Sequence, residues 1–400
     1  MEEVAARTGS AREVFLAFLK LGLTSFGGPI AHLGYFRDEI VVRRRWLDEA
    51  EYADLVALCQ FLPGPASSQV GFALGLWRAG PLGALVAWVA FTLPSAALLV
   101  AFALGAAALD GPGPQGVLHG LKLVAVAVVA QAVWGMARTL APDRQRAMIA
   151  VVAVALTILL AGSLGQVAAI VLGGLAGLVY CRDGGTAVAA AMRFPVSRTV
   201  GMASLGLFAV LLVGLPIAAS AANAHGLDLF DAFYRAGALV FGGGHVVLPL
   251  LDAETVASGW ISKDAFLAGY GAAQAVPGPL FTFAAYLGAV GNLAPNGITG
   301  AAIALVAIFL PGFLLLVGAL PFWDALRTVP LAQAGMRGAN AAVVGILGAA
   351  LYDPVWLSAV LSPFDFVLAL AGFVALVVWK APPWTVVVAL AAVGGVAGPM

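Results

Sequence analysis

Four short breaks in apolar sequence carry the residue types best suited to binding a ligand. Phe26-Gly27-Gly28-Pro29 and Pro63-Gly64-Pro65 interrupt two apolar segments of the first half, and Phe241-Gly242-Gly243-Gly244 and Pro277-Gly278-Pro279 interrupt two segments of the second. A helix broken in this way exposes backbone N–H groups at the start of the next half-helix, where the helix dipole attracts anions. The simpler alternative is that glycine and proline only kink packed helices. Because the breaks recur at matched places, we expect an anion site built from them.

Two basic residues precede the Phe-Gly-Gly breaks at equivalent positions. Lys20 and Arg235 each lie inside an apolar segment, six residues before the phenylalanine. A cation in the hydrocarbon region costs about 2.5–3.5 kcal/mol on insertion scales, so such residues are rarely idle. Each side chain could instead extend to the membrane interface and stay hydrated. Since both halves keep a base here, we expect these residues to contact the substrate.

Other polar residues flank the breaks. Gln60 and Gln274 precede the Pro-Gly-Pro breaks and could donate to an oxyanion, or only to a carbonyl that the break leaves free. His32, His245 and Asp54 are candidates for proton coupling, although packed histidines and a charge at a helix start are plainer readings. We expect the substrate to contact Lys20, Ser25, Phe26, Gly27, Gly28, Gln60, Pro63, Gly64, Pro65, Arg235, Phe241, Gly242, Gly243, Gln274, Pro277, Gly278 and Pro279.

The sequence around the breaks is duplicated. FLAFLKLGLTSFGGP at 15–29 is similar to LFDAFYRAGALVFGGG at 229–244, and AFTLP at 90–94 is similar to AIFLP at 307–311. Several long motifs, LTSFGGPIAHLGYFRDEIV, RRRWLDEAEYADLVALCQFLPGP, LVFGGGHVVLPLL and AQAVPGP, follow one another in order. These motifs resemble the chromate ion transporter family in its long two-domain form, and the resemblance covers nearly the whole chain.

This resemblance implies a secondary transporter, not an enzyme, that exports chromate from the cytoplasm across the inner membrane and gives chromate resistance. The membrane potential or the proton-motive force would drive it. Sulfate has the same charge and shape, so it is an expected competitor, and a sulfate or other oxyanion carrier is one alternative. The other alternative is a membrane scaffold or enzyme that uses the breaks only for packing. We expect lipid as a partner, no cofactor and no nucleic acid, and leave a homodimer open.

The composition requires a lipid environment. Of 400 residues, 62% are hydrophobic and 10% are charged, whereas soluble proteins carry roughly 25% charged residues. The formal net charge is zero, which gives no reason to expect nucleic-acid binding. The two cysteines, Cys59 and Cys181, have no metal-ligand spacing, and no phosphate-binding loop or nucleophile motif is present.

The order of apolar segments predicts an all-α integral membrane protein made of two homologous halves in an inverted repeat. We expect a first repeat at 13–181, a linker and an orientation-inverting span at 182–221, and a second repeat at 228–400. The loop at 37–51 contains four arginines, while the equivalent loop at 252–264 contains one lysine. If each broken segment is a hairpin that returns to its starting side, the basic loop is cytoplasmic and the other loop faces outward.

Overall fold

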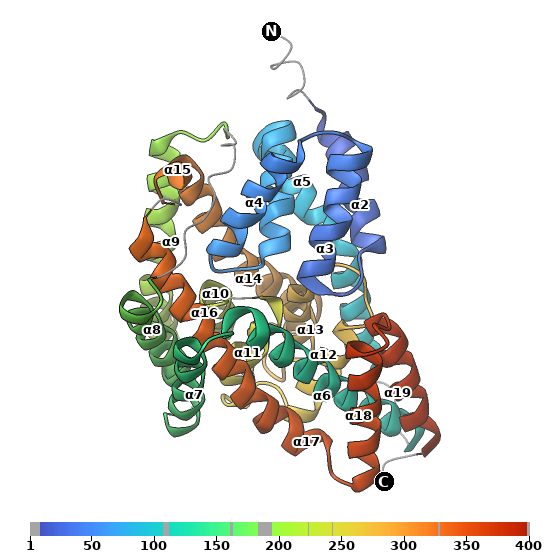
Figure 1. Cartoon of the computed structure of the whole chain (residues 1–400). Coiled ribbons are helices and arrows are strands. Elements are labelled where there is room, and N and C mark those ends of the chain that lie inside the picture. Colours follow the sequence, from blue (N-terminus) through green and yellow to red (C-terminus); the bar gives the residue numbers. More distant parts are fainter. Residues whose placement is uncertain are drawn as a thin grey trace.

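The structure is a computed structural model, and it describes residues 9–106, 112–160, 163–182, 194–222, 224–241, 243–326 and 329–397. Within these residues the chain forms helices, turns and connecting segments, with no β-strand (Figure 1). The predicted all-α fold is therefore confirmed. Gly242, one of the expected substrate contacts, lies outside the described residues, as does part of the linker at 182–221. The three unit boundaries given above stay a prediction.

Both broken segments of the first half are present as pairs of helices. The first break separates α2 (Ala11–Thr24) from α3 (Gly28–Phe36). Helix α2 ends at Ser25, whose backbone is extended, and Gly27 adopts a left-handed conformation directly before α3. Pro63-Gly64-Pro65 separates α4 (Glu49–Phe61) from α5 (Ala66–Ala106). The first half continues with a π-helical segment, η1 (Arg37–Arg43), after α3 and with α6 (Pro112–Leu140), α7 (Arg144–Leu159) and α8 (Ser163–Tyr180) after α5.

The second half repeats this order after α9 (Arg198–Ala222). Its first break separates α10 (His225–Ala238) from η2 (Gly244–Val246), and its second separates α12 (Lys263–Ala273) from η4 (Leu280–Thr282). The remaining helical elements are α11 (Val247–Leu251), η3 (Asp252–Val256), α13 (Phe283–Val290), α14 (Gly297–Ala319), η5 (Leu320–Phe322), α15 (Trp323–Leu326), α16 (Pro330–Ala350), η6 (Leu351–Trp356), α17 (Leu357–Ala359), α18 (Pro363–Val377) and α19 (Pro383–Ala397).

Side-chain contacts show that the broken segments of the first half return to the end at which they start. Glu13, at the start of α2, accepts a hydrogen bond from Trp46 Nε1 at 2.9 Å. The same carboxylate forms an ion pair with Arg78 at 3.2 Å. Trp46 follows the first hairpin, and Arg78 lies near the end of the second, just before the helix α5 breaks at Ala79 and Gly80. The start of α2 therefore lies beside the ends of both hairpins of the first half.

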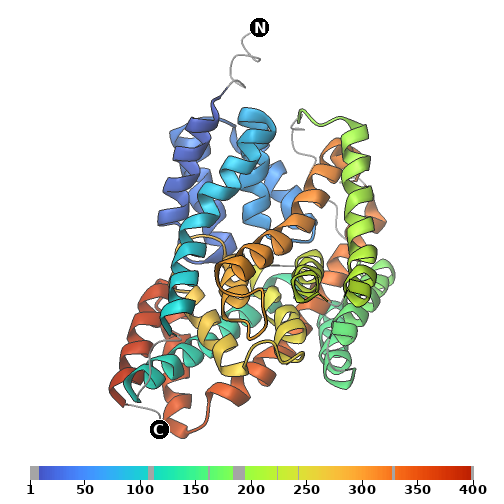
Figure 2. The same cartoon turned by 180° about the vertical axis from the view of Figure 1, so that it is seen from behind.

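Equivalent positions meet in the second half. The ring of His225, at the start of α10, lies 4.7 Å from that of Trp260. The Trp260 carbonyl accepts from the backbone N–H of Asn292 at 3.1 Å. Both halves therefore consist of two hairpins followed by continuous helices. In Figures 1 and 2, α2 to α4 lie toward one end of the molecule, whereas α18 and α19 lie at the opposite end.

The continuous helices are long and apolar enough to cross a membrane. Within the described residues, five helices qualify by length and composition, at Ala66–Gly105, Pro114–Leu140, Arg198–Ala222, Gly297–Phe322 and Pro330–Ala359. Glycines let these helices approach closely, as is usual in lipid. A Cβ added to Gly338 on α16 would lie 2.1 Å from the Gly173 carbonyl oxygen on α8, so only glycine fits this crossing.

Candidate functional site

Two equivalent hydrogen bonds join the four breaks to one another. The backbone N–H of Gly64 donates to the carbonyl of Val240 at 2.7 Å, and the N–H of Gly278 donates to the carbonyl of Ser25 at 2.8 Å. Each Pro-Gly-Pro break thus pairs with the residue just before the Phe-Gly-Gly break of the other half. We call this region the junction. The two glycine N–H groups that we expected to face an anion are engaged in these bonds.

Glycine is required at the junction for two reasons. Gly64 has φ +119° and Gly278 has φ +103°, a region that side-chain-bearing residues rarely adopt. A Cβ on Gly64 would also lie 3.0 Å from the Cα of Gly312, and one on Gly278 would lie 2.9 Å from Ser95 Oγ. The flanking prolines, Pro63, Pro65, Pro277 and Pro279, lie in the non-helical bends between the helices, where Leu62 and Pro279 have extended backbone.

The two Phe-Gly-Gly loops also lie against each other. A Cβ on Gly244 would lie 3.1 Å from the Pro29 ring, and one on Gly28 would lie 3.8 Å from His245 Nε2. Gly27, Gly28 and Gly243 all have positive φ, so the backbone turns sharply at both loops. Phe26 and Phe241 are half-buried beside them. The sequence-predicted breaks are therefore brought together, except that Gly242 is not described.

A cluster of buried hydroxyl and imidazole groups lies on the first-half side of the junction. His32 Nδ1 is 3.4 Å from Ser67 Oγ, and the His32 ring packs edge-on against Phe91 at 5.5 Å. Ser95 Oγ, which faces Gly278, donates to the Thr92 carbonyl at 3.1 Å. Ser68 directly follows Ser67 on α5, and Thr92 lies three residues before Ser95 on the same helix. We call Ser25, His32, Ser67, Ser68, Thr92 and Ser95 the hydroxyl cluster; each is at most 3% exposed.

Several polar atoms of the hydroxyl cluster have no hydrogen-bond partner among the described residues. They are Ser25 Oγ, Ser68 Oγ, Thr92 Oγ1 and His32 Nε2. A buried polar group without a partner costs about 1–3 kcal/mol. Such groups are uncommon in native proteins, and several together indicate a place where a polar ligand binds.

The equivalent positions of the second half are mostly apolar. Gly22 packs on the Phe91 carbonyl and Gly237 on the Ile308 carbonyl, which confirms that AFTLP and AIFLP occupy the same place in the two halves. By this register Phe309 replaces Thr92 and Gly312 replaces Ser95. Val240, Phe281 and Thr282 replace Ser25, Ser67 and Ser68 in turn. The Thr282 hydroxyl is satisfied, since it donates to the Pro279 carbonyl at 2.8 Å.

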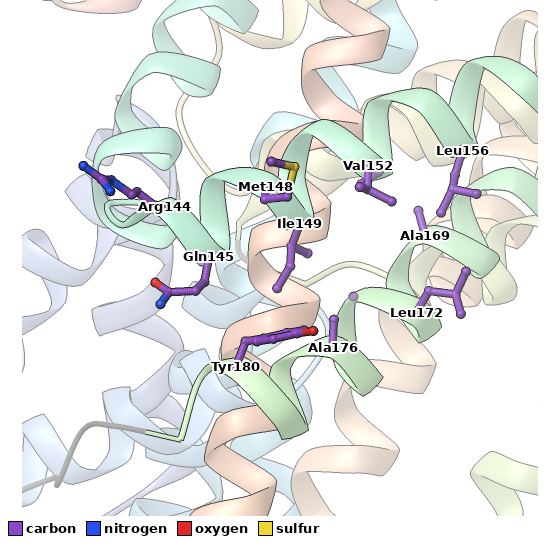
Figure 3. A pocket seen from close by; sticks show the side chains of 12 residues that line it. Arg144, Gln145, Met148, Ile149, Val152, Leu156, Ala169, Leu172, Ala176 and Tyr180 are labelled. Carbon is purple, nitrogen blue, oxygen red and sulfur yellow. The ribbon is translucent and has the colours of Figure 1, made fainter.

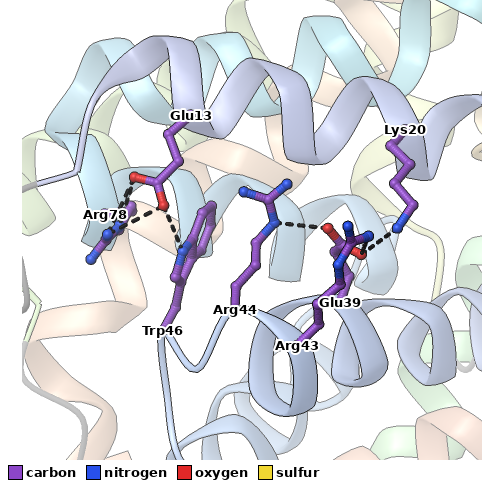
Figure 4. A network of polar contacts seen from close by, with 7 residues as sticks. All are labelled: Glu13, Lys20, Glu39, Arg43, Arg44, Trp46 and Arg78. Atoms are coloured by element: carbon purple, nitrogen blue, oxygen red, sulfur yellow. Dashed lines mark hydrogen bonds and ion pairs between the residues drawn. The ribbon is translucent and has the colours of Figure 1, made fainter.

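Lys20 is paired within its own hairpin. Its Nζ lies 2.6 Å from Glu39 Oε2, and the same carboxylate contacts Arg43 at 3.2 Å and Arg44 at 2.8 Å (Figure 4). Glu39 is only 5% exposed, while the Lys20 side chain is 47% exposed. We call these four residues the first ion cluster.

Arg235 has the equivalent partner in the second half. Its guanidinium binds Glu254 through two parallel hydrogen bonds of 3.0 and 2.9 Å, and it also contacts Asp231 at 3.0 Å. Lys20 and Glu39 are nineteen residues apart, as are Arg235 and Glu254. These three residues form the second ion cluster. The structure therefore places both predicted bases in ion pairs with glutamates that the sequence analysis did not single out.

The remaining candidates are dispersed. Gln60 is exposed, and Gln274 donates to the Tyr270 carbonyl at 3.3 Å. His245 Nδ1 lies 2.7 Å from the Tyr270 hydroxyl, which fixes its ring beside the junction. Asp54 is buried and accepts from Trp323 Nε1 at 3.1 Å, so it joins the first half to α15 of the second. Of the three proton-coupling candidates, His32 and His245 border the junction.

A cavity of about 420 Å³ lies elsewhere, between α7 and α8. Its walls include Met148, Val152 and Leu172, with Arg144 at one end and Tyr180 on α8 (Figure 3). Met148, Val152 and Leu172 are each about half or more exposed, so the groove opens to the lipid side of the helices. None of its lining residues belongs to a break, and we do not assign it to substrate.

Two parts of this arrangement had a detectable signal in the sequence. The first is the difference between the duplicated motifs AFTLPS and AIFLPG, in which Phe309 stands at the position of Thr92 and Gly312 at the position of Ser95. The equivalence of Glu39 and Glu254 was visible in the loops that follow the breaks. That the hydroxyls of Ser25, Ser68 and Thr92 are buried without a partner among the described residues could only be seen in three dimensions.

Known proteins are similar to most of this chain. The family model described as "Chromate transporter" matches residues 12–178 and 227–396, which separates the two halves at the linker. The chain belongs to the chromate transporter family. The two matched regions confirm the duplication, and family membership indicates a transporter rather than an enzyme.

Three curated relatives within this family cover most of the chain. A chromate transport protein of Pseudomonas aeruginosa is 31% identical over 96% of this chain and 91% of its own length. A probable chromate transport protein of Synechococcus elongatus is 29% identical over 97% and 95%, and a chromate transport protein of Cupriavidus metallidurans is 28% identical over 86% and 83%. No solved structure gives a significant match. Membership and the apolar helices together support a multi-pass membrane protein with a role in chromate transport.

Proposed function

We propose that this chromate transporter family member exports chromate from the cytoplasm across the inner membrane and thereby gives chromate resistance. The observation that carries the proposal is the junction, where the four breaks of two homologous halves meet beside unpartnered buried hydroxyls. Transporters place substrate between repeats at such breaks, where half-helix N-termini and polar groups replace the anion's water. The printed names of the relatives suggest the substrate.

The conformation described here keeps the hydroxyl cluster closed to solvent. A transport cycle therefore requires the hairpins of one half, then of the other, to move away from the junction. The two ion clusters join hairpin arms within each half, so their release is a natural part of that movement. We propose that Lys20 and Arg235 contact the anion when their glutamates release them.

The electrical gradient favours export. With the cytoplasm negative, moving a divalent anion outward gains about 4.6 kcal/mol per 100 mV, twice the value for one charge. Import against this field would need more than two coupled protons. The proposed coupling residues His32, Asp54 and His245 are few, which fits export driven mainly by the membrane potential.

A sulfate carrier is the second candidate. Hydroxyl groups recognise the oxygen atoms of a tetrahedral oxyanion, and sulfate and chromate share this shape and charge. The hydroxyl cluster alone gives no reason for one to exclude the other.

Inside-out membrane vesicles test these proposals. We expect labelled chromate to accumulate in vesicles that contain the protein, and the rate to rise when the lumen is made positive with a potassium gradient and valinomycin. Unlabelled sulfate in excess measures competition, and labelled sulfate measures whether it is itself transported. Faster sulfate than chromate uptake would support the second candidate. Uptake of neither anion would indicate a scaffold or an enzyme.

A further inference from the structure

The two sides of the junction differ in their capacity to bind an oxyanion. The first-half side has three hydroxyl oxygens, on Ser25, Ser68 and Thr92, that are buried and unpartnered among the described residues. The equivalent second-half residues are Val240, Thr282 and Phe309. Of these only Thr282 has a hydroxyl, and that hydroxyl is already bonded to a carbonyl.

The second-half side is closed by aromatic packing. Phe309 stacks with Phe313 at 5.8 Å, and Phe313 stacks with Phe72 at 4.3 Å. Phe281 also packs against Phe309 at 5.6 Å. Gly312, the equivalent of Ser95, has no side chain, and its carbonyl accepts a hydrogen bond from Gln69 Nε2 at 2.9 Å. The second-half residues on this side therefore offer apolar surface and satisfied groups. The unpartnered atoms beside them, Trp88 Nε1 and Gln69 Oε1, belong to α5 of the first half.

We propose that a tetrahedral oxyanion binds on one side of the junction only, where the uncharged hydroxyl groups of Ser25, Ser68 and Thr92 donate to its oxygens. The inference rests on the proposed function for the identity of the anion as chromate. His32 borders this site, and its Nδ1 contact with Ser67 orients the ring toward it. The aromatic side serves as a dry wall, which lowers the local dielectric and strengthens the hydrogen bonds to the anion.

The chemistry of the site explains why unpartnered hydroxyls persist there. A hydroxyl that faces an ionised acceptor makes a hydrogen bond roughly twice as strong as a neutral one. In this closed conformation Lys20 and Arg235 stay paired with their glutamates, so neutral donors alone hold the dianion at the junction. The two bases contact the anion only when the hairpins open. The three hydroxyls therefore gain hydrogen-bond partners only when the substrate is bound, and the free-energy cost of leaving them unpartnered is removed at that point.

Repeat-equivalent substitutions test the proposal. We expect Ser68→Ala and Thr92→Val each to raise the KM for chromate by about tenfold in proteoliposomes, the value for loss of one hydrogen bond to a charged group. Thr282→Val is the matched control, because its hydroxyl donates to Pro279 and belongs to the other side. We expect its KM to stay within about twofold of the unmodified protein.

Thermal stability separates a binding role from a structural one. Because the Thr92 hydroxyl has no partner, replacing it with an isosteric methyl should leave the melting temperature of the substrate-free protein unchanged or higher. Stabilisation by added chromate should be lost in the same variant. A lower melting temperature with unchanged KM would overturn the proposal, as would an equal KM rise in Thr282→Val.

The one-sided site can be tested even if the protein does not transport chromate. If the unmodified protein transports sulfate instead, the same variants are measured with sulfate, and the one-sided site stands or fails on that anion. If it transports neither anion, stabilisation of the purified protein by chromate and by sulfate is compared between Thr92→Val and Thr282→Val. Equal stabilisation of both variants would refute the site.

Discussion

The two ion clusters occupy equivalent places in the two halves but carry opposite charge. In the first, Glu39 meets three bases, Lys20, Arg43 and Arg44, which leaves a formal surplus of two positive charges. In the second, Arg235 meets two acids, Glu254 and Asp231, which leaves a surplus of one negative charge. The backbone repeat is preserved while the charges are not. Duplication thus conserved the hairpin and its central ion pair, and each half acquired its own electrostatic surroundings.

The surroundings also shift the two glutamates in opposite directions. Burial alone would raise the pKa of Glu39, but hydrogen bonds from Lys20 and Arg44 lower it below its ordinary value of 4.5. Burial raises the pKa of Glu254 above that value, and Arg235 only partly opposes the shift while Asp231 adds to it. The same residue type at the same place therefore responds differently to acid.

The largest effect is expected at the junction glycines, which should be equally sensitive in both halves. Gly64→Leu and Gly278→Leu should each abolish chromate transport, because a side chain would meet Gly312 or Ser95 and the positive φ would be strained. Gly206→Leu on α9 is the control, since nothing lies within 4 Å of its added Cβ. Transport is measured in vesicles and normalised to protein amount. A normal rate in either junction variant would show that its break is only a packing kink.

Neutralising the matched bases should have the next largest effect. Lys20→Gln and Arg235→Gln should each weaken apparent chromate affinity by about 1.5–3 kcal/mol, the value for a hydrogen bond to a charged group. The loss should be greater for Arg235→Gln, because it also leaves Glu254 and Asp231 unneutralised. Concentration-dependent uptake gives both affinities. Unchanged affinity in both would mean that these bases only hold the hairpins together.

Removing the central carboxylates should affect stability unequally. Glu39→Gln leaves three cations facing one another, and we expect a loss of about 1.5–3 kcal/mol in unfolding free energy. Glu254→Gln should cost little or nothing, since Asp231 remains to pair with Arg235 and burial disfavours the ionised form of Glu254. Thermal unfolding in detergent compares the two variants with the unmodified protein. A larger loss of unfolding free energy in Glu254→Gln than in Glu39→Gln would contradict the proposed role of the charge difference between the clusters.

Acid should separate the two glutamates further by a smaller margin. Because the folded pKa of Glu254 is raised, its ionisation opposes folding, and its protonation as pH falls toward 4.5 should add stability. Because the folded pKa of Glu39 is lowered, the stability it contributes is present above 4.5 and lost as pH falls through the folded value. The gain in melting temperature at low pH that Glu254 causes should be absent in Glu254→Gln. The loss in melting temperature at low pH that Glu39 causes should be absent in Glu39→Gln. Identical pH profiles for both variants would contradict this assignment.

The smallest effect on activity is expected from single cysteines in the two loops. Ala50→Cys at 37–51 and Ala257→Cys at 252–264 replace exposed alanines, so transport should be unchanged. If the halves are inverted in the membrane, an impermeant thiol reagent should label only Ala257→Cys in intact cells. The native Cys59 and Cys181 are buried, which limits background labelling. Labelling of both positions from outside would exclude opposite orientation.

The sequence by itself determined the helical membrane fold, the duplication and the positions of the four breaks. These follow from composition, from apolar segment length and from the local effect of glycine and proline, none of which requires distant contacts. It also marked Lys20 and Arg235, because a base within an apolar segment is visible without a structure.

Only the tertiary structure decided what these residues meet. Gly64 reaches Val240 and Gly278 reaches Ser25 across the two halves, and no local pattern specifies a partner that far along the chain. The unpartnered state of Ser25, Ser68 and Thr92 likewise depends on which groups surround them after folding. A hydroxyl beside a break can bond its own helix or face a ligand, and the choice is made by packing between the halves.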